Sequence, residues 1–266
     1  MKKFDVTEYE IKTDKISSET GYTFVVISDL HSNVYGVDLQ SVLNRIDEIA
    51  PDAVLMAGDI FNGKKGDDFS SAMDFVGEIS EKYQIFFGLG NHEYRLAMDQ
   101  EKYGNAIWEI MEQLGELGVV VLSDETVVLE KGEDKIALSA VEIDSIFYKR
   151  RPIVMGSGIM DMHLGCADMD VFNLLIAHNP RYFENYAKWG ADLVLSGHVH
   201  GGTVILPWGK PLIGTDFRLF PKYSGGLYEE CNSRMIVSRG LGTHSIKVRI
   251  NNKPELVVVK IVANKA

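Results

Sequence analysis

Apolar residues follow two periods along the first half of the chain. Short unbroken apolar runs are typical of buried strands. The strand candidates of this half are residues 24–27, 53–57, 85–89 and 119–122. Between them, apolar residues recur every three or four positions, which predicts amphipathic helices. The helix candidates are residues 39–49, 69–79 and 107–117, and Pro51 should end the first of them.

The second half is richer in strand patterns. Residues 125–142 suggest a hairpin, whereas residues 144–170 have no clean period and should form an irregular loop with a short helix. A helix should begin at Pro180 and end at Gly190. The other strand candidates are residues 174–177, 193–195, 235–237, 246–250 and 256–262. Because no linker or repeat interrupts the chain, we predict an α/β (α+β) protein of one domain, residues 1–266, in which two packed sheets have helices outside.

Small clusters of polar residues follow five of the predicted strands. The clusters are Asp29-Leu30-His31, Asp59, Asn91-His92-Glu93, His178-Asn179 and His198-Val199-His200, and they hold five of the seven histidines. In an open α/β sheet, the carboxyl ends of neighbouring strands meet at one crevice. Carboxylate and imidazole together suit divalent first-row metals. Because the donors exceed the four that one tetrahedral zinc ion takes, two ions sharing a carboxylate would use them better.

Each of these clusters also has an ordinary interpretation. Taken alone, Asp29 to His31 resembles a capped loop, Gly58-Asp59 a turn, and His178 the entry to a helix. The alternate histidines of Gly197 to Gly202 are more specific, because a glycine-rich turn has little structural use for them. The five clusters in this order favour a metal site.

The same series of motifs resembles the calcineurin-like metallophosphoesterases. The resemblance rests on DLH at residues 29–31, GD at 58–59, GNHE at 90–93, His178, and GHVH at 197–200. It implies a four-layer sandwich of two mixed β-sheets flanked by helices. AHNP, LVLSGHVHGG and SRGLGT resemble the bacterial YkuE-type branch. That branch is related to hydrolases that cleave the pyrophosphate of UDP-diacylglucosamine.

The resemblance also implies roles for these residues. One metal would be held by Asp29, His31, Asp59 and His200, and the other by Asp59, Asn91, His178 and His198, with Asp59 as the bridge. Two divalent ions, chosen from Mn, Fe, Zn and Co with Mn or Fe favoured, would make metal-bound hydroxide available for in-line attack on a phosphodiester, pyrophosphate or phosphomonoester. His92 would stabilise or protonate the leaving oxygen, although it could instead be a structural support.

Composition restricts the substrate and the location of the protein. The chain has 27 Lys and Arg against 38 Asp and Glu, a net charge of −11, which disfavours long nucleic acid. Two cations could still make the site locally positive, so a small phosphorylated substrate is expected. The N-terminus lacks the apolar core of a signal peptide, and no apolar run approaches the ~20 residues of a membrane span. We therefore predict a cytoplasmic protein without a transmembrane anchor.

Three further features have more than one interpretation. The basic run at residues 148–151 could bind a second phosphate or be a solvated surface. Residues 204–208 and 212–213 could line the site or form a hairpin over the core, whereas His163 and His244 should be ordinary surface or core histidines. The rival functions are a metal-free binding scaffold, which should have lost ligands, and a different metallohydrolase that cleaves acyl or amide bonds.

Overall fold

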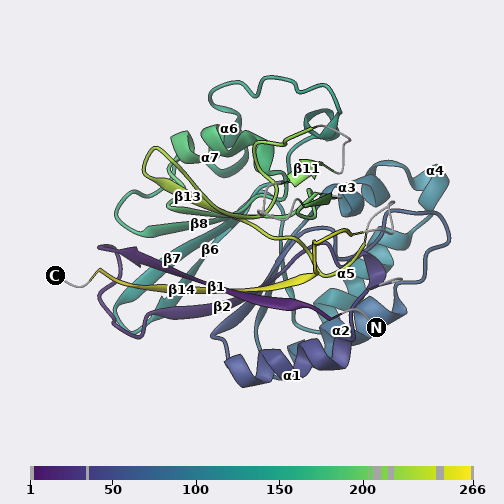
Figure 1. The fold of residues 1–266 in the computed structure, drawn as a ribbon, viewed down its shortest axis with the longest axis horizontal. Helices are drawn as coiled ribbons and strands as arrows, with labels where there is room; N and C mark the ends of the chain where they lie inside the picture. Colours follow the sequence, from purple (N-terminus) through teal and green to yellow (C-terminus); the bar gives the residue numbers. More distant parts are fainter. Residues whose placement is uncertain are drawn as a thin grey trace.

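Two mixed six-stranded sheets form the centre of the molecule (Figure 1). The computed structural model describes residues 3–33, 36–202, 204–205, 211–214, 219–243 and 249–264. The first sheet consists, in spatial order, of β1 (Asp5–Thr13), β14 (Glu255–Ala263), β2 (Tyr22–Ile27), β3 (Ala53–Ala57), β4 (Ile85–Gly88) and β5 (Val120–Leu122). The second consists of β12 (Gly226–Glu230), β13 (Ser233–Val237), β9 (Leu193–Ser196), β8 (Phe172–Ile176), β7 (Asp134–Ala140) and β6 (Glu125–Lys131).

Helices cover the outer faces of the two sheets (Figure 1). The helices of the first half are α1 (Leu39–Ile49), α2 (Ser70–Ser80), α3 (Asn91–Met98), α4 (Gln100–Tyr103) and α5 (Ala106–Glu116). Those of the second half are α6 (Ile159–Leu164) and α7 (Phe183–Trp189). Short 3-10 helices are η1 (His31–Asn33), η2 (Ser145–Tyr148) and η3 (Pro180–Tyr182).

The alternation of side chains along each strand produces three apolar layers. Phe24 of β2 points between the sheets and packs in one cluster with Leu174 of β8. Its neighbour Val25 points the other way, into a second cluster with residues of α1, α2 and α5. Leu175 likewise packs beneath α6 and α7. Both faces of these strands are therefore buried, which is why they appear as continuous apolar runs, and the predicted four-layer fold is confirmed.

The strands that carry the motifs run parallel within each sheet. β2, β3 and β4 pair in parallel, and so do β8 and β9. Parallel neighbours bring their carboxyl ends to the same edge, and the polar clusters follow those ends.

Some elements were not predicted from the sequence. β1 alternates charged and apolar residues and pairs in parallel with β14, and α3 begins at Asn91, inside a motif. β10 (Val204–Ile205) pairs with β11 (Pro211–Ile213), as a hairpin requires, but residues 206–210 lie outside the described residues. So do His244 and most of the expected strand 246–250. Among the described residues, none of the helices combines the length and apolar character needed to cross a membrane.

Candidate metal centre

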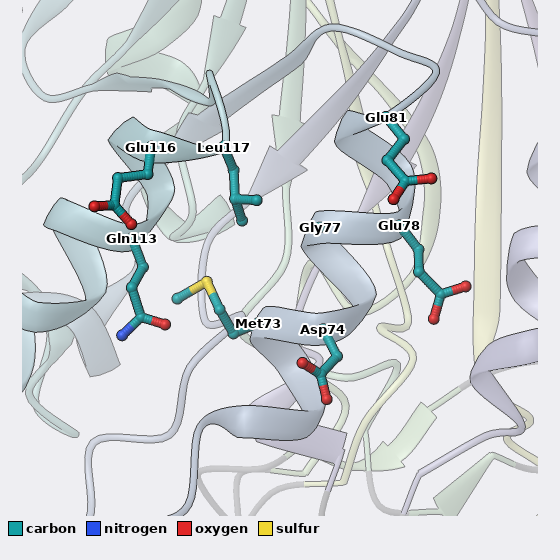
Figure 2. A pocket seen from close by; sticks show the side chains of 8 residues that line it. All are labelled: Met73, Asp74, Gly77, Glu78, Glu81, Gln113, Glu116 and Leu117. Carbon is teal, nitrogen blue, oxygen red and sulfur yellow. The ribbon is translucent and has the colours of Figure 1, made fainter.

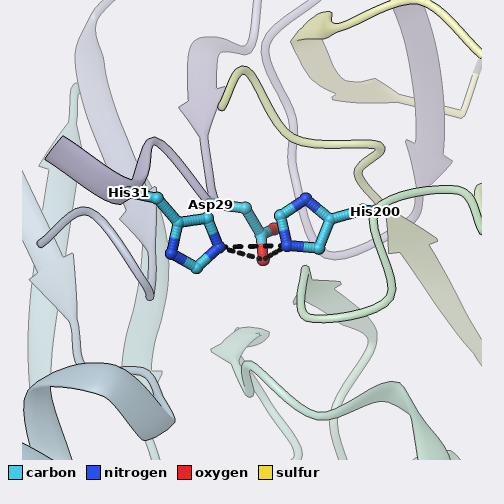
Figure 3. A group of neighbouring side chains, drawn as sticks. All are labelled: Asp29, His31 and His200. Carbon is cyan, nitrogen blue, oxygen red and sulfur yellow. Dashed lines mark hydrogen bonds and ion pairs between the residues drawn. The ribbon is translucent and has the colours of Figure 1, made fainter. Parts of the chain in front are cut away.

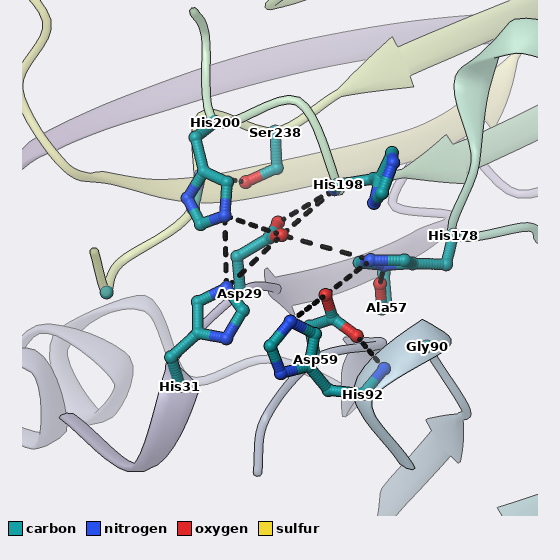
Figure 4. A network of polar contacts seen from close by, with 12 residues as sticks. Asp29, His31, Ala57, Asp59, Gly90, His92, His178, His198, His200 and Ser238 are labelled. Atoms are coloured by element: carbon teal, nitrogen blue, oxygen red, sulfur yellow. Dashed lines mark hydrogen bonds and ion pairs between the residues drawn. The ribbon is translucent and has the colours of Figure 1, made fainter. Parts of the chain in front are cut away.

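The loops that follow β2, β3, β4, β8 and β9 meet at one place between the two sheets (Figure 4). All eight predicted site residues lie at the ends of these strands. Asp29, Asp59, His178, His198 and His200 are on the loops, His31 begins η1, and Asn91 and His92 begin α3. Backbone hydrogen bonds join the loops, from the Asp29 N–H to the Gly58 carbonyl and from the Gly197 N–H to the His178 carbonyl. Most of these side chains are buried, and only Asn91 and His198 are partly exposed. Solvent therefore reaches the site from the side of these two residues.

Five of the eight residues have a left-handed backbone. The φ angles are 51° at Asp29, 50° at His31, 54° at Asp59, 69° at His198 and 48° at His200. This conformation is uncommon for residues with a side chain, and it costs of order 1–3 kcal/mol per residue. Such strain persists where the surrounding structure imposes it, and it collects at functional sites. At this site it turns the side chains that follow β2, β3 and β9 toward a common centre.

Two glycines allow the loops to approach closely. A methyl group at Gly90 would collide with the backbone nitrogen and carboxylate of Asp59, and one at Gly197 would collide with the carboxylate of Asp29. Neither glycine has a positive φ, so these positions need the absence of a side chain rather than special backbone freedom.

The buried Glu93 carboxylate holds two of the loops together. It accepts hydrogen bonds from the N–H groups of Asp59 (3.0 Å), Phe61 (2.9 Å) and Gly90 (2.9 Å). Glu93 thus ties the loop after β3 to the loop after β4. Its motif was visible in the sequence, but this bracing role was not predicted.

Asp29, His31 and His200 form the first candidate ligand group (Figure 3). The ligand atoms of the three side chains converge. His31 Nε2 lies 3.0 Å from His200 Nε2, and His200 Nε2 lies 3.3 Å from Asp29 Oδ1. Two imidazole nitrogens and a carboxylate oxygen facing one point suit a divalent first-row cation.

Asp59 belongs to two other groups of possible ligands. One group joins it to His178 and His198, and the other joins it to His31 and His92. The amide oxygen of Asn91 is buried and makes no hydrogen bond to the described residues. Asp59 therefore lies between the two sets of donors, where a shared ligand would have to lie.

Hydrogen bonds to the rings distinguish His178 from His92. His178 Nδ1 lies 2.7 Å from the Ala57 carbonyl oxygen, which can only accept, so in the neutral ring Nδ1 carries the proton and Nε2 has its lone pair toward the centre. A metal-bound histidine typically donates its other N–H in this way. His92 Nδ1 instead accepts from the Gly63 N–H at 2.8 Å, so its neutral ring carries the proton on Nε2. The first tautomer suits a ligand, and the second suits a hydrogen-bond donor at Nε2.

A partly buried arginine, Arg249, lies beside His200. The Arg249 Nη2 atom lies 3.3 Å from His200 Nδ1, but it also contacts the carbonyl oxygens of Gly240 and Gly242. These two carbonyls use both of its hydrogens, so the His200 ring need not accept a third bond. Arg249 thereby positions the loop beside His200 and was not recognised in the sequence, because it lies far from the motifs.

The charges of the site are strongly coupled. Burial, opposed by the nearby His178, raises the pKa of Asp29 to about 6. Burial also acts to raise the pKa of Asp59, but the charges of His178 and His92 outweigh it and hold that pKa well below its ordinary value. Burial would lower the pKa of His178, yet the Asp59 and Asp29 carboxylates raise it to about 10. A proton on His178 balances the buried carboxylates, and a cation bound there would have to displace it.

Two cavities adjoin the partly exposed side of the centre. The Phe220 cavity, about 270 Å³, is lined by His198 and by Phe220. The Tyr94 cavity, about 360 Å³, is lined by Asn91 and Tyr94. Tyr148 lies between them, because it lines the Tyr94 cavity and its ring packs edge-on against His198 with 5.1 Å between centroids. The basic run is thus divided, with Tyr148 and Lys149 at the site and Arg150 and Arg151 exposed.

A third cavity lies away from the centre, between α2 and α5 (Figure 2). It measures about 500 Å³, and its lining includes Asp74, Glu78, Glu81 and Glu116. These carboxylates would repel a phosphorylated compound. This cavity is therefore a poor candidate for the substrate site. His163, which pairs with Asp124 at 2.7 Å, also lies outside the three ligand groups.

Comparisons with known proteins agree with this geometry. The sequence model of the calcineurin-like phosphoesterases matches residues 22–202. The uncharacterized metallophosphoesterase YkuE of Bacillus subtilis (strain 168) is 27% identical over 258 residues, covering 96% of this chain and 84% of that protein. Phosphodiesterase YaeI of Escherichia coli (strain K12) is 24% identical over 251 residues, covering 91% of this chain and 82% of that protein. The solved structure of the NAD nucleotidase NadN from Haemophilus influenzae shares the fold, with a TM-score of 0.50, 13% identity, and coverage of 83% of this chain and 45% of that chain.

Proposed function

The chain belongs to the calcineurin-like phosphoesterase family and is a metal-dependent phosphoester hydrolase, and from this premise we propose that it hydrolyses a small phosphodiester with two divalent cations. The position of Asp59, whose carboxylate groups with His178 and His198 on one side and with His31 on the other, is the observation that carries the proposal. A single cation would leave one of these groups without a partner for its converging donors.

The residues at the site fit such a pair of cations. Asp29, His31 and His200 would hold one cation and His178, His198 and Asn91 the other, with Asp59 between them. The Nδ1–H of His178, directed at the Ala57 carbonyl, leaves the Nε2 lone pair available. When bound, two cations supply Lewis acidity and make hydroxide available near neutral pH.

His92 would act on the leaving group. Its Nδ1 accepts from the Gly63 N–H, and its protonated Nε2 lies 3.9 Å from Asp59 Oδ2, on the side that faces the centre. The ring is therefore oriented to direct its Nε2–H at the reacting phosphoryl group. We assign it the task of stabilising the departing oxygen by donating a hydrogen bond to it where negative charge develops, and loss of one such donor typically costs 10²–10³ in rate, about 2.7–4 kcal/mol.

The substitution Asp59→Asn tests the shared ligand. We expect the variant to lose most of its bound metal and its hydrolysis of bis(4-nitrophenyl) phosphate. Asp74→Asn, the same change at an exposed position of α2, is the matched control and should keep both. Metal content after purification and activity with added Mn, Fe, Zn or Co are the measurements, with Mn or Fe expected to be most effective. Full activity of Asp59→Asn would refute the proposal.

The substitution His92→Ala tests this hydrogen-bond donor. It should keep the metal but lower kcat by about 10²–10³ for esters of alkyl alcohols, whose leaving oxygens develop a localised negative charge. The loss should be much smaller for esters of 4-nitrophenol, because nitrophenolate spreads that charge over its ring. An equal loss for both kinds of ester would contradict the assigned role and favour a structural one.

The preference for a diester has two supports. The similar protein from Escherichia coli is named a phosphodiesterase, and the two cavities beside Asn91 and His198 could each receive one substituent of a diester. The alternative substrates are phosphomonoesters and pyrophosphates, including pyrophosphates of the UDP-diacylglucosamine type. A panel of bis(4-nitrophenyl) phosphate, 4-nitrophenyl phosphate, UDP-sugars and acyl esters separates them. Cleavage of acyl esters alone would overturn the phosphoesterase assignment.

A further inference from the structure

The Phe220 cavity has the dimensions of a binding site for one substituent of the substrate. It measures about 270 Å³ and includes His198, one of the proposed ligands, in its wall. A benzene ring fits a cavity of about 150 Å³. The Phe220 cavity therefore has room for one ring and a small group attached to it.

The wall away from His198 is apolar and partly exposed. Leu219 and Phe220 line the cavity while exposing 65% and 62% of their surface. Phe220 also has a φ of 51°, which is rare for an aromatic residue. An exposed aromatic side chain buries little apolar surface, so it does not offset the free-energy cost of a strained backbone. Strain of this kind collects at binding sites. Val199 completes the apolar lining beside the centre.

The charged side chains on the rim of this cavity already have partners. Lys222 Nζ lies 3.4 Å from Glu230 Oε2, and Arg181 Nη1 donates to the Lys149 carbonyl at 2.8 Å. The apolar wall is therefore the feature of the cavity that would select a substituent.

From these observations we infer that the Phe220 cavity binds a ring-sized apolar substituent of the substrate. The ring packs against Phe220, Leu219 and Val199. The phosphorus is then next to His198, where the proposed cations would engage it. This inference deepens the proposed function and rests on it.

Competitive inhibition of bis(4-nitrophenyl) phosphate hydrolysis tests the inference. Phenylphosphonate and methylphosphonate share the metal-binding group and differ in the ring. In the wild-type enzyme the inhibition constant of phenylphosphonate should be about 10–100-fold lower, as expected for burying one aromatic ring. Phe220→Ala should reduce that ratio to about threefold or less, whereas Phe220→Tyr, which keeps the ring, should retain it.

One control makes the test specific to this cavity. Trp108→Ala removes an aromatic residue that is 60% exposed on α5 and should leave the ratio unchanged.

The outcomes distinguish this inference from the proposed function. Equal inhibition by the two phosphonates, no inhibition by either, or a ratio that survives Phe220→Ala would overturn the inference while hydrolysis continues. A wild-type enzyme that hydrolyses no phosphodiester with any of the four metals would instead refute the proposed function.

Discussion

Replacing Gly90 by alanine should displace Asp59, the ligand that the two proposed cations share, without changing its carboxylate group. Gly90 has φ −108° and ψ −177°, which alanine adopts freely, so the backbone itself adds no cost. The new methyl group, however, would collide with the backbone nitrogen and the carboxylate oxygen Oδ1 of Asp59, and it would lie 3.0 Å from Asp59 Cγ. Asp59 would have to retreat by about 1 Å to restore ordinary contact distances.

The contacts of Asp59 give the size of the effect. Its Oδ1 accepts from the His92 N–H at 2.8 Å, and its own N–H donates to Glu93 at 3.0 Å. Overpacking typically costs 1–3 kcal/mol, and weakening two hydrogen bonds adds about 0.5–1.5 kcal/mol each. We therefore expect Gly90→Ala to lower the free energy of unfolding by about 2–6 kcal/mol. A shift of about 1 Å in the metal site should also lower kcat by about 10²-fold.

Urea unfolding in the presence of a chelator measures the first effect, and hydrolysis of bis(4-nitrophenyl) phosphate at saturating metal measures the second. Gly115→Ala is the matched control, because Gly115 lies in α5 and a methyl group there has no neighbour within 4 Å. It should stabilise the protein by up to about 1 kcal/mol and leave the activity unchanged. If Gly90→Ala kept its activity within threefold and its stability within about 0.5 kcal/mol, close packing would not be what positions Asp59.

Two further predictions concern protons and metal at the same site. Without metal, the pKa of His178 is higher in the folded protein than in the unfolded chain, so the folded protein holds the His178 proton more tightly. The resulting stabilisation is complete below about pH 6.5 and should be lost as the pH rises toward about 10. Urea unfolding in chelator from pH 6.5 to 10 should therefore show falling stability, and a flat profile would contradict the charge balance described above. Metal at 100 times its dissociation constant should raise the free energy of unfolding by about 2.7 kcal/mol per site. Metal binding should also release protons, which calorimetry in two buffers measures. Binding without either effect would mean that the metal is held elsewhere.

The sequence alone determined the interior strands and the order of the motifs. Strands buried on both faces have unbroken apolar runs, so β2 and β3 were predictable within two residues from composition and period. The polar residues that follow them were predictable as a group, because parallel strands end at a common edge. β1 was not predictable in this way: its alternating charged residues resemble a solvated segment until β14 provides a partner.

Only the tertiary structure decided how the site residues differ from one another. The position after a strand does not separate His92 from His178, and only the resemblance implied different roles for them. The Gly63 N–H and the Ala57 carbonyl assign opposite tautomers to the two rings. The structure likewise brought Arg249 to His200 and Phe220 to His198, across 49 residues of sequence in the first pair. Periodicity and motif spacing report local conformation, whereas proton positions and cavity walls depend on which loops meet. That meeting is set by the packing of the two sheets.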